Sequence, residues 1–348
     1  MLKKNLGIIG GGQLGSMLSV AAKKLNIKTV IYSDDPDAPA QNFADDFIFG
    51  NYDDKEKILQ FINKVDLITY EFENIPFETL NEMNKLKTVL PKPSVNRLIQ
   101  HRLAEKDFIN KLNIRTTRYV SVEKKSDTET LVDFLPGILK TTTMGYDGKG
   151  QYPIRNIKDF NSLNIDFSKG YILEKLVKLK KEISVIVTRF GNNKFEIYEP
   201  IENTHQDQIL KNSKIPADIN KKILQQSKDW ATTIAEELKY IGTLCVEFFI
   251  DRNENLYVNE IAPRVHNSGH LTINAFNISQ FENHIRAVCA LEKIPLNKIS
   301  NAKMINLIGN EIEPYRKNLK LNDNEFFFDY QKKEVKEKRK MGHITTLI

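Results

Sequence analysis

The carboxylates with the clearest chemical meaning lie in two apolar runs early in the last third of the chain. Glu247 lies within GTLCVEFFID, and Asn259 and Glu260 lie within LYVNEIA, with a turn-like DRNEN between them. Two strands joined in this way set oxygen ligands side by side, which suits a hard cation such as Mg²⁺. The alternative is a pair of ordinary surface carboxylates. A carboxylate among apolar neighbours needs a partner, so we expect Glu247 and Glu260 to hold a metal ion.

A glycine-rich loop, MGYDGKGQ at residues 144–151, follows an apolar run that ends at Lys140. Three glycines in six residues let backbone amides approach a phosphate closely, and Lys149 adds a positive charge. Lys140 would reach the inner phosphates of a nucleotide. The alternative is a hairpin turn with an exposed lysine. The pattern G-x-x-x-x-G-K-[ST] of the P-loop does not occur.

Two further segments carry clustered polar groups. EKLVKLKKE contains Glu174 and Glu182, which would read an adenine edge and bind ribose hydroxyls; on its own it is an ordinary charged turn. APRVHNSGH, residues 262–270, directly follows the Asn259–Glu260 pair and packs an arginine, two histidines, an asparagine and a serine into seven residues. Loops that leave a metal site often contact substrate, and the alternative is a surface loop.

The N-terminal segment GIIGGGQLG contains G-x-G-x-x-G at Gly10, Gly12 and Gly15, between a strand-like and a helix-like stretch. Asp34 and Asp35 follow at the distance of a ribose-binding carboxylate. By itself this pattern predicts a dinucleotide-binding fold and, as one interpretation, a nicotinamide oxidoreductase.

The elements that would position these groups alternate at first and then become rich in strands. LGIIG, KTVIYS, DDFIFG, DLITYEF and KTVLP read as strands, with helices at residues 13–25, 53–64 and 77–86, which predicts a parallel sheet covered on both faces. A helix over 95–112 precedes five strands between 119 and 203. Further helices are expected over 217–238 and 278–291, and the last strands are MINLIG, FFFDY and HITTL. We therefore predict an α/β domain followed by α+β domains.

Composition narrows the class of protein. The 348 residues are 41% hydrophobic, which suffices for two or three packed domains, and no apolar run is long enough to span a membrane. No signal peptide is recognisable, so we expect a soluble, cytoplasmic protein. Cys245 and Cys289 have no metal-ligand spacing and are expected to be reduced. The net charge of +6 is spread along the chain, which disfavours nucleic-acid binding; only KKEVKEKRK at residues 332–340 is concentrated.

Taken together, these motifs resemble the ATP-grasp superfamily, and within it the N5-carboxyaminoimidazole ribonucleotide synthetase family. The resemblance runs through GGGQLGSML, DDPDAPA, YEFENI, GYDGKGQ, ENTHQDQIL, NEIAPRVHNSGH, MINLIG and RKMGH, which covers nearly the whole chain. It implies an ATP-grasp fold with a Rossmann-like pre-ATP-grasp domain (residues 1–93), an ATP-grasp domain (94–291, with a glycine-loop subdomain over about 115–177) and a small β-rich C-terminal domain (292–348).

The resemblance also implies site residues. Glu247 and Glu260 match the positions for magnesium. Arg264, His266 and Asn267 would be catalytic, with His266 and Asn267 orienting bicarbonate. Glu71 or Glu73 would be the proton acceptor, and because the two are two residues apart on a strand we expect them to share a face. Gly12, Gln13, Leu14 and Ser268 would border the substrate. ATP would be bound by Arg102, Lys140, Gly145, Tyr146, Asp147, Gly148, Lys149, Gly150, Gln151, Glu174, Lys175, Leu176, Val177, Glu182, His205, Asn259 and Glu260.

The implied reaction is the ATP-dependent carboxylation of 5-aminoimidazole ribonucleotide by bicarbonate through carboxyphosphate, in purine biosynthesis. Mg²⁺ would be required, with neither nicotinamide nor biotin, and a homodimer is expected. A Lys/Arg pair near the C-terminus would bind the substrate phosphate. Arg339 matches that pair, whereas a YxK motif indicates Lys332 and an ungapped count from RKMGH indicates Lys333, which we favour. The nearest alternative is the formate-dependent glycinamide ribonucleotide transformylase.

Two departures from the family pattern stand out. Ser16 occupies a position where an arginine commonly follows GQLG, and the chain stops soon after HITTL. The resemblance also changes the interpretation of the N-terminal glycines, whose turn would border the aminoimidazole nucleotide and not a dinucleotide pyrophosphate.

Overall fold

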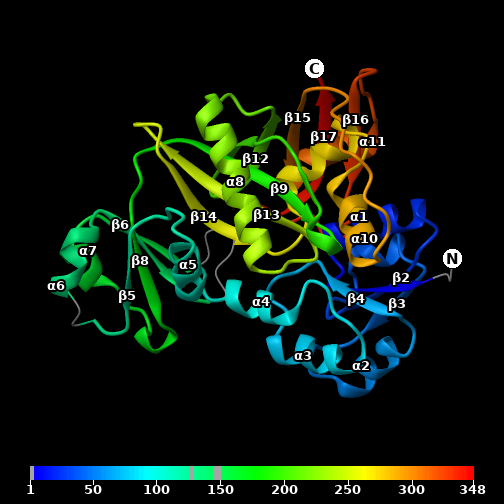
Figure 1. The fold of residues 1–348 in the computed structure, drawn as a ribbon, viewed down its shortest axis with the longest axis horizontal. Helices are drawn as coiled ribbons and strands as arrows, with labels where there is room; N and C mark the ends of the chain where they lie inside the picture. The colour runs from blue at the N-terminus through cyan, green and yellow to red at the C-terminus, as the bar shows by residue number, and fades with distance from the viewer. Residues whose placement is uncertain (1–3, 126–127, 144–149) are drawn as a thin grey trace.

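A computed structural model describes residues 4–125, 128–143 and 150–348 of the chain. It has a small parallel sheet at one end, a long antiparallel sheet in the middle and a second small sheet at the opposite end (Figure 1). The first small sheet contains the N-terminal strands, and the second contains the strands on either side of the glycine-rich loop. Within the described parts of the chain, no helix is both long and apolar enough to cross a membrane.

The N-terminal sheet has the order β3-β2-β1-β4 and is parallel throughout. Its strands are β1 (Asn5–Ile9), β2 (Lys28–Ser33), β3 (Asp46–Phe49) and β4 (Leu67–Tyr70), which confirms four of the predicted strands. The fifth, KTVLP, forms only a single parallel bridge between Ile68 and Val89. One face is covered by α1 (Gln13–Lys24), and the other by α2 (Lys55–Ile62) and α3 (Phe77–Leu86). This is the layered arrangement that alternating strands and helices predict.

The helix predicted over residues 95–112 is two helices, α4 (Pro93–Ile99) and α5 (Arg102–Lys111). The His101 side chain accepts a hydrogen bond from the backbone N–H of Ala104, so it caps a new helix where the hydrophobic pattern suggested continuity. The break matters because the α5 N-terminus lies at the start of the ATP-grasp segment, where the Arg102 backbone N–H donates to the carbonyl of Thr142 at 2.9 Å.

The glycine-loop subdomain is an antiparallel sheet of order β5-β8-β6-β7. Its strands are β5 (Tyr119–Val122), β6 (Gly137–Thr141), β7 (Gln151–Ile154) and β8 (Tyr171–Lys175), with short helices α6 (Thr128–Leu131) and α7 (Ile157–Ser162). The predicted loop residues Gly145, Tyr146, Asp147, Gly148 and Lys149 lie outside the described residues. Lys140 and Gln151 face each other across the β6–β7 pair, so this hairpin brings the two ends of the loop together.

The middle of the molecule is an antiparallel sheet that, in the described residues, has nine strands. Its order is β14-β13-β9-β11-β12-β15-β17-β16, with β10 (Phe195–Ile197) on β9. The strands are β9 (Leu179–Arg189), β11 (Ile201–Gln206), β12 (Ile209–Ile215), β13 (Gly242–Asp251), β14 (Leu256–Ala262), β15 (Ala302–Ile308), β16 (Glu325–Asp329) and β17 (Lys340–Leu347). The C-terminal strands therefore extend the ATP-grasp sheet, because β15 pairs with β12.

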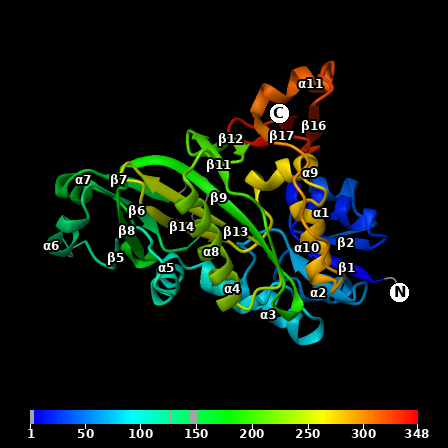
Figure 2. The same cartoon turned by 45° about the horizontal axis from the view of Figure 1, so that its top comes forward.

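Helices cover this sheet and join it to the N-terminal one (Figure 2). The predicted long helix is α8 (Lys221–Glu237), capped by Asn220, and it packs on the apolar face of β9 and β13. The last predicted helix is α10 (Gln280–Val288), which packs against α1. Short helices α9 (Thr272–Ala275) and α11 (Glu313–Lys317) lie near the C-terminal strands. The fold thus brings residues from the N-terminal, ATP-grasp and C-terminal segments of the chain to the region between the sheets.

Candidate active site

The predicted β13–β14 hairpin forms and places the two carboxylates as expected. Glu247 pairs directly with Glu260, and the register shifts at the next residue so that Phe248 pairs with Val258. Asn259 is therefore the extra residue of a bulge, a feature that re-aims side chains next to functional sites. The sequence alone does not reveal this bulge, because it arises from the pairing of the two strands.

The hairpin has the donor set that a hard cation needs. Glu247, Glu260 and Asn259 offer only oxygen ligands. The Asn259 Oδ1 atom is buried and has no hydrogen-bond donor within reach in the described residues, which is unusual for a buried amide oxygen. The described residues contain no group of three or more His, Cys, Asp or Glu side chains arranged for a metal. The residues therefore fit an ion that completes its coordination with substrate oxygens and water.

Glu247 is held by His266, whose Nε2 lies 2.9 Å from Glu247 Oε1. Burial alone would raise the pKa of Glu247, but the hydrogen bond from His266, together with nearby positive charge such as that of Arg264, outweighs burial, so the pKa is lowered. The carboxylate is therefore ionised at neutral pH. We expect His266 to contact bicarbonate. In the structure its ring also contacts Glu247, the expected metal ligand.

Glu174 is the centre of a buried charge cluster that includes one residue the sequence analysis missed. Lys140 Nζ lies 3.1 Å from Glu174 Oε1, and Lys106 Nζ lies 3.4 Å from Glu174 Oε2. Thr117 donates a further hydrogen bond at 3.0 Å. Burial opposes ionisation, but the two ammonium groups outweigh burial and lower the pKa of Glu174 to about 2.

Lys106 itself is 1% exposed and lies on α5, one turn after Arg102. Its ammonium donates to Thr116, to Thr117 and to the carbonyl of Asn259. Burial is the main cause of its lowered pKa, which the charge of Glu174 only partly offsets. Nothing in the sequence marks this lysine, because a lysine on an amphipathic helix usually lies in solvent.

Other expected ATP-binding residues form pairs at the same place. Arg102 Nη1 lies 3.3 Å from Glu260 Oε2, and His205 Nδ1 lies 2.6 Å from Glu182 Oε2. Burial would lower the pKa of His205, but the hydrogen bond and charge of Glu182 raise it. Three further expected residues follow one another here: Lys175 is the last residue of β8, and Leu176 and Val177 lie on the connection from β8 to β9. The Lys175 ammonium donates to the carbonyl of Asp133, and Leu176 is 52% exposed.

Glu71 and Glu73 do not share a strand face, contrary to the sequence-based interpretation. Strand β4 ends at Tyr70, and the two side chains turn to different partners. Glu73 forms a two-point pair with Arg264, with Arg264 Nη2 2.8 Å from Glu73 Oε1 and Nε bonded to Oε2. Burial would raise the pKa of Glu73, but Arg264 outweighs burial and lowers it.

Glu71 lies in the N-terminal glycine turn. Its Oε1 accepts a hydrogen bond from the backbone N–H of Gly12 at 2.7 Å, so a carboxylate of the chain occupies the anion position at the start of α1. A Cβ atom on Gly10, whose φ is +98°, would lie 2.8 Å from the Glu71 side chain. Burial is the largest cause of the raised pKa of Glu71, which the Gly12 amide only partly offsets.

The two candidate lysines at the C-terminus have different surroundings. Lys332 Nζ lies 2.7 Å from Gln13 Oε1 and 2.7 Å from the carbonyl of Lys340, so it reaches the glycine turn. Lys333 instead forms an exposed ion pair with Asp37. The guanidinium of Arg339 lies 3.4 Å from the carbonyl of Glu334. The geometry therefore favours Lys332, although the count from RKMGH favours Lys333.

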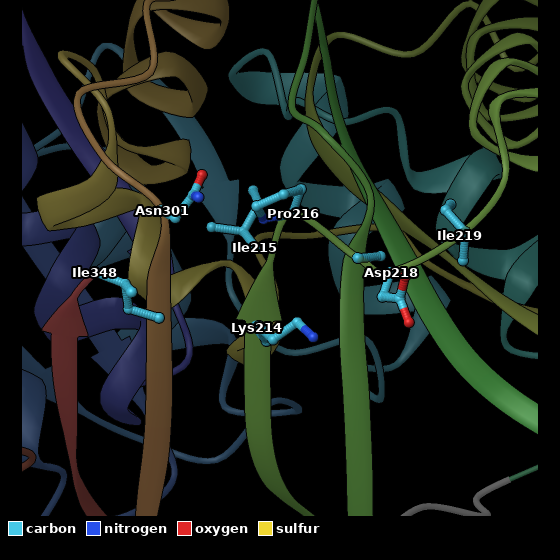
Figure 3. A pocket seen from close by; sticks show the side chains of 8 residues that line it. Lys214, Ile215, Pro216, Asp218, Ile219, Asn301 and Ile348 are labelled. Carbon is cyan, nitrogen blue, oxygen red and sulfur yellow. The ribbon is translucent and has the colours of Figure 1, made fainter.

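The remaining expected residues of APRVHNSGH, Asn267 and Ser268, lie in the protein interior next to the site. Asn267 is 7% exposed and accepts a hydrogen bond from Asn306 Nδ2 at 2.5 Å, and Ser268 is fully buried. Leu14 is buried in the core beneath α1. A separate hollow of about 350 Å³ lies at the end of β12, with Lys214, Pro216, Asp218, Asn301 and Ile348 among its lining residues (Figure 3). None of the residues that line it belongs to the expected site.

A parallel N-terminal sheet, an antiparallel glycine-loop sheet and a carboxylate-bearing hairpin on a larger sheet define an ATP-grasp enzyme. Family models agree: residues 3–100 match the ribonucleotide synthetase preATP-grasp domain, 107–281 the ATP-grasp domain, and 302–348 the phosphoribosylaminoimidazole carboxylase C-terminal domain. The chain belongs to the N5-carboxyaminoimidazole ribonucleotide synthase family. This confirms the predicted fold class and family.

Three relatives give the extent of the similarity. N5-carboxyaminoimidazole ribonucleotide synthase of Bacillus subtilis strain 168 is 40% identical over 344 residues, which span 98% of this chain and 90% of the relative. The Staphylococcus aureus enzyme crystallised with ADP superimposes with a TM-score of 0.91 at 37% identity, over 99% of this chain and 93% of that one. The Aspergillus clavatus enzyme in complex with ADP and 5-aminoimidazole ribonucleotide superimposes with a TM-score of 0.90 at 26% identity, over 99% and 94%.

Proposed function

We propose that this protein catalyses the ATP-dependent carboxylation of 5-aminoimidazole ribonucleotide by bicarbonate, giving N5-carboxyaminoimidazole ribonucleotide, ADP and phosphate. Full-length similarity to enzymes of that name supports this reaction over the formate-dependent alternative. The observation in the structure that carries the proposal is the Glu247–Glu260 hairpin, beside Arg102 and close to the Glu174–Lys140 pair. Such a site binds Mg·ATP and aims its terminal phosphate at an acceptor.

The site residues divide the chemistry among them. We assign Lys140 and Arg102 to the phosphates, and Glu182 with His205 to the nucleoside end of ATP. A divalent ion at Glu247 and Glu260, with Asn259 as a further oxygen donor, would neutralise charge on the transferred phosphoryl group. Bicarbonate is a poor electrophile, so phosphorylation to carboxyphosphate precedes attack by the exocyclic amine. That intermediate reacts with water, and the glycine loop at residues 144–151 is assigned the role of excluding water.

Of the two glutamates, we propose Glu71 as the acceptor of the amine proton. Glu73 is engaged at both oxygens by Arg264, and its lowered pKa makes it a weak base. Glu71 has a raised pKa and lies against Gly12 and near Lys332. Arg264, oriented by Glu73, and His266 are assigned to bicarbonate.

The test is phosphate release from Mg·ATP and bicarbonate, with and without 5-aminoimidazole ribonucleotide, together with detection of the carboxylated product. Release that requires the nucleotide is expected. Release that is indifferent to it would overturn the substrate assignment while leaving the fold intact. Glu71→Gln should lower kcat more than it changes KM for the nucleotide. An unchanged kcat would rule out Glu71 as the proton acceptor.

We also propose that Lys332 and Arg339 bind the substrate phosphate. We further propose that the enzyme is a homodimer in the cytoplasm. Lys332→Ala should raise KM for the nucleotide about tenfold or more, because a charge-assisted contact is lost, and leave KM for ATP unchanged. Lys333→Ala removes only an exposed pair with Asp37 and should have little effect. The reverse pattern would support Lys333. Sedimentation analysis tests the dimer.

A further inference from the structure

A row of buried polar side chains crosses four adjacent strands of the large sheet and ends at Glu247. Ser213 on β12, Asn203 on β11 and Ser184 on β9 lie on neighbouring strands, and Ser184 is paired in register with Glu247 on β13. Ser184 and Ser213 are 0% and 1% exposed, and Asn203 is 7% exposed. Buried polar side chains must find partners inside the protein, and Ser184 lies between the buried apolar residues Ile183 and Val185, so a continuous line of hydrogen-bonding groups here needs an explanation.

The contacts along the row are all within hydrogen-bond distance. Ser213 Oγ donates to Asn203 Oδ1 at 2.9 Å, and Asn203 Nδ2 donates to Ser184 Oγ at 2.9 Å. Ser184 Oγ lies 2.8 Å from Ser268 Oγ, which lies 2.8 Å from His266 Nδ1. His266 Nε2 then lies 2.9 Å from Glu247 Oε1. The row therefore connects the interior of the sheet to the expected metal ligand.

A backbone contact fixes the direction of the hydrogen bonds at the histidine. The backbone N–H of Ser268 donates to His266 Nδ1 at 3.3 Å, and a backbone donor cannot reverse its role. Nδ1 is therefore the acceptor nitrogen, so the ring proton is on Nε2 and is donated to Glu247. In this tautomer His266 also accepts the hydroxyl proton of Ser268.

The other end of the row requires the same direction. Asn203 donates to Ser184, so the Ser184 proton must go elsewhere. Among the described residues it has two acceptors within reach, Ser268 Oγ and the Cys245 thiol, and a thiol sulfur is the weaker acceptor. With Ser184 donating to Ser268, Ser268 donates to His266. Every hydrogen bond from Ser213 to Glu247 then points the same way.

We propose that Ser184, Asn203, Ser213 and Ser268 are positioning residues, which hold His266 as an Nε2–H donor to Glu247. Aligned hydrogen bonds in a low-dielectric interior polarise one another, so the row directs a donor at the carboxylate without adding a net charge. Outer groups that orient a metal ligand in this way usually affect activity strongly. The effect on catalysis rests on the proposed function of Glu247, whereas the tautomer of His266 does not.

Two variants test the row. Asn203→Asp keeps the shape of the side chain but replaces its donor with an acceptor, so the Ser184 hydroxyl donates to residue 203 and the hydrogen bond from Ser184 to Ser268 is lost. Ser184→Ala interrupts the row without introducing charge, and keeps the test decisive if the buried aspartate prevents folding. Matched controls are Asn283→Asp, a fully buried amide on α10, and Thr188→Val, which removes a buried hydroxyl from β9, the strand of Ser184.

The first measurement is the ¹⁵N spectrum of the histidine rings, with His266 assigned from His266→Gln. A protonated Nε2 and an unprotonated Nδ1 are expected in the unaltered protein. In Asn203→Asp and Ser184→Ala the Nδ1 signal should shift, because the hydrogen bond from Ser268 to Nδ1 loses the polarising neighbour that strengthens it. The second is kinetics: Asn203→Asp and Ser184→Ala should lower kcat or Mg²⁺ affinity by about ten- to a hundredfold, and the controls by far less. A protonated Nδ1 in the unaltered protein, or kinetics equal to the controls, would overturn the proposal. Failure of the unaltered protein to carboxylate the nucleotide would count only against the proposed function.

Discussion

At the scale of single residues, the site is built on buried charges that compensate one another. Glu174 is shared by Lys106 and Lys140, Glu73 is bound at both oxygens by Arg264, and Glu247 is held by His266. Each carboxylate has a lowered pKa although burial opposes ionisation, so the specific partner outweighs desolvation in each case. Removing one partner should therefore cost far more than removing a surface charge.

Lys106 offers the sharpest test of this balance. Lys106→Met keeps the length of the side chain but leaves two hydroxyls and one side of Glu174 without their donor. Because Lys140 still pairs with Glu174, we expect a loss of about 3 kcal/mol in the free energy of unfolding, near the lower end for a broken buried ion pair. Urea unfolding measures it, with the exposed Lys111→Met on the same helix as control. A loss no larger than in the control would mean that Lys106 is not an essential member of the cluster.

At the scale of elements, the N-terminal strand–turn–helix unit uses its glycines to accommodate a side chain of the chain itself. The Glu71 side chain follows β4 and lies against all three glycines of the turn, Gly10, Gly12 and Gly15. It accepts a hydrogen bond from the backbone N–H of Gly12, the residue just before α1. A dinucleotide fingerprint and this turn need the same small residues, because both bring an anion close to a helix N-terminus. The pattern therefore predicts the turn correctly and cannot distinguish a bound phosphate from an internal carboxylate.

A double-mutant cycle tests this fit between turn and side chain. Gly10→Ala should destabilise the protein by about 1 to 3 kcal/mol, because φ is +98° and the new Cβ would lie 2.8 Å from Glu71. In a Glu71→Ala background the steric part of the cost disappears and only the backbone strain remains. We expect a coupling of about 1 kcal/mol between the two changes in thermal or urea unfolding. Strict additivity would show that Glu71 does not fill the turn in solution.

At the scale of the whole molecule, α10 joins the N-terminal sheet to the large sheet through a buried histidine. His284 Nδ1 accepts a hydrogen bond from the backbone N–H of Thr243 on β13 at 3.1 Å, and Nε2 lies 2.8 Å from Thr69 Oγ1 on β4. Burial lowers the pKa of His284 to about 3. Burial likewise lowers the pKa of His343, on β17, to about 3.

These buried histidines make stability depend on pH with a definite sign. An unfolded histidine has a pKa of about 6.5, so between pH 6.5 and 3 the unfolded chain binds more protons than the folded one, and stability falls as pH falls. Each such histidine contributes a slope of about 1.4 kcal/mol per pH unit. His284→Gln should therefore destabilise the protein at pH 7.5 but flatten the slope between pH 6.5 and 5 by one proton. Urea unfolding across this range measures it, and an unchanged slope would contradict the prediction.

The sequence by itself determined the family, the order of the elements and most of the residues that meet at the site. Motifs such as NEIAPRVHNSGH and RKMGH, and the alternation of apolar residues along each strand, are local properties that can be read directly from the sequence. The β13–β14 hairpin and the pairing of Glu247 with Glu260 follow from the same local information.

Only the tertiary structure distinguished candidates that are adjacent in the sequence. Glu71 and Glu73 separate because one meets Gly12 and the other Arg264, and Lys332 differs from Lys333 because it reaches Gln13, more than three hundred residues away in the chain. Lys106 and the row from Ser213 to His266 depend in the same way on strands and helices meeting in space. Side-chain partners across such distances are set by packing and burial, which no local pattern encodes.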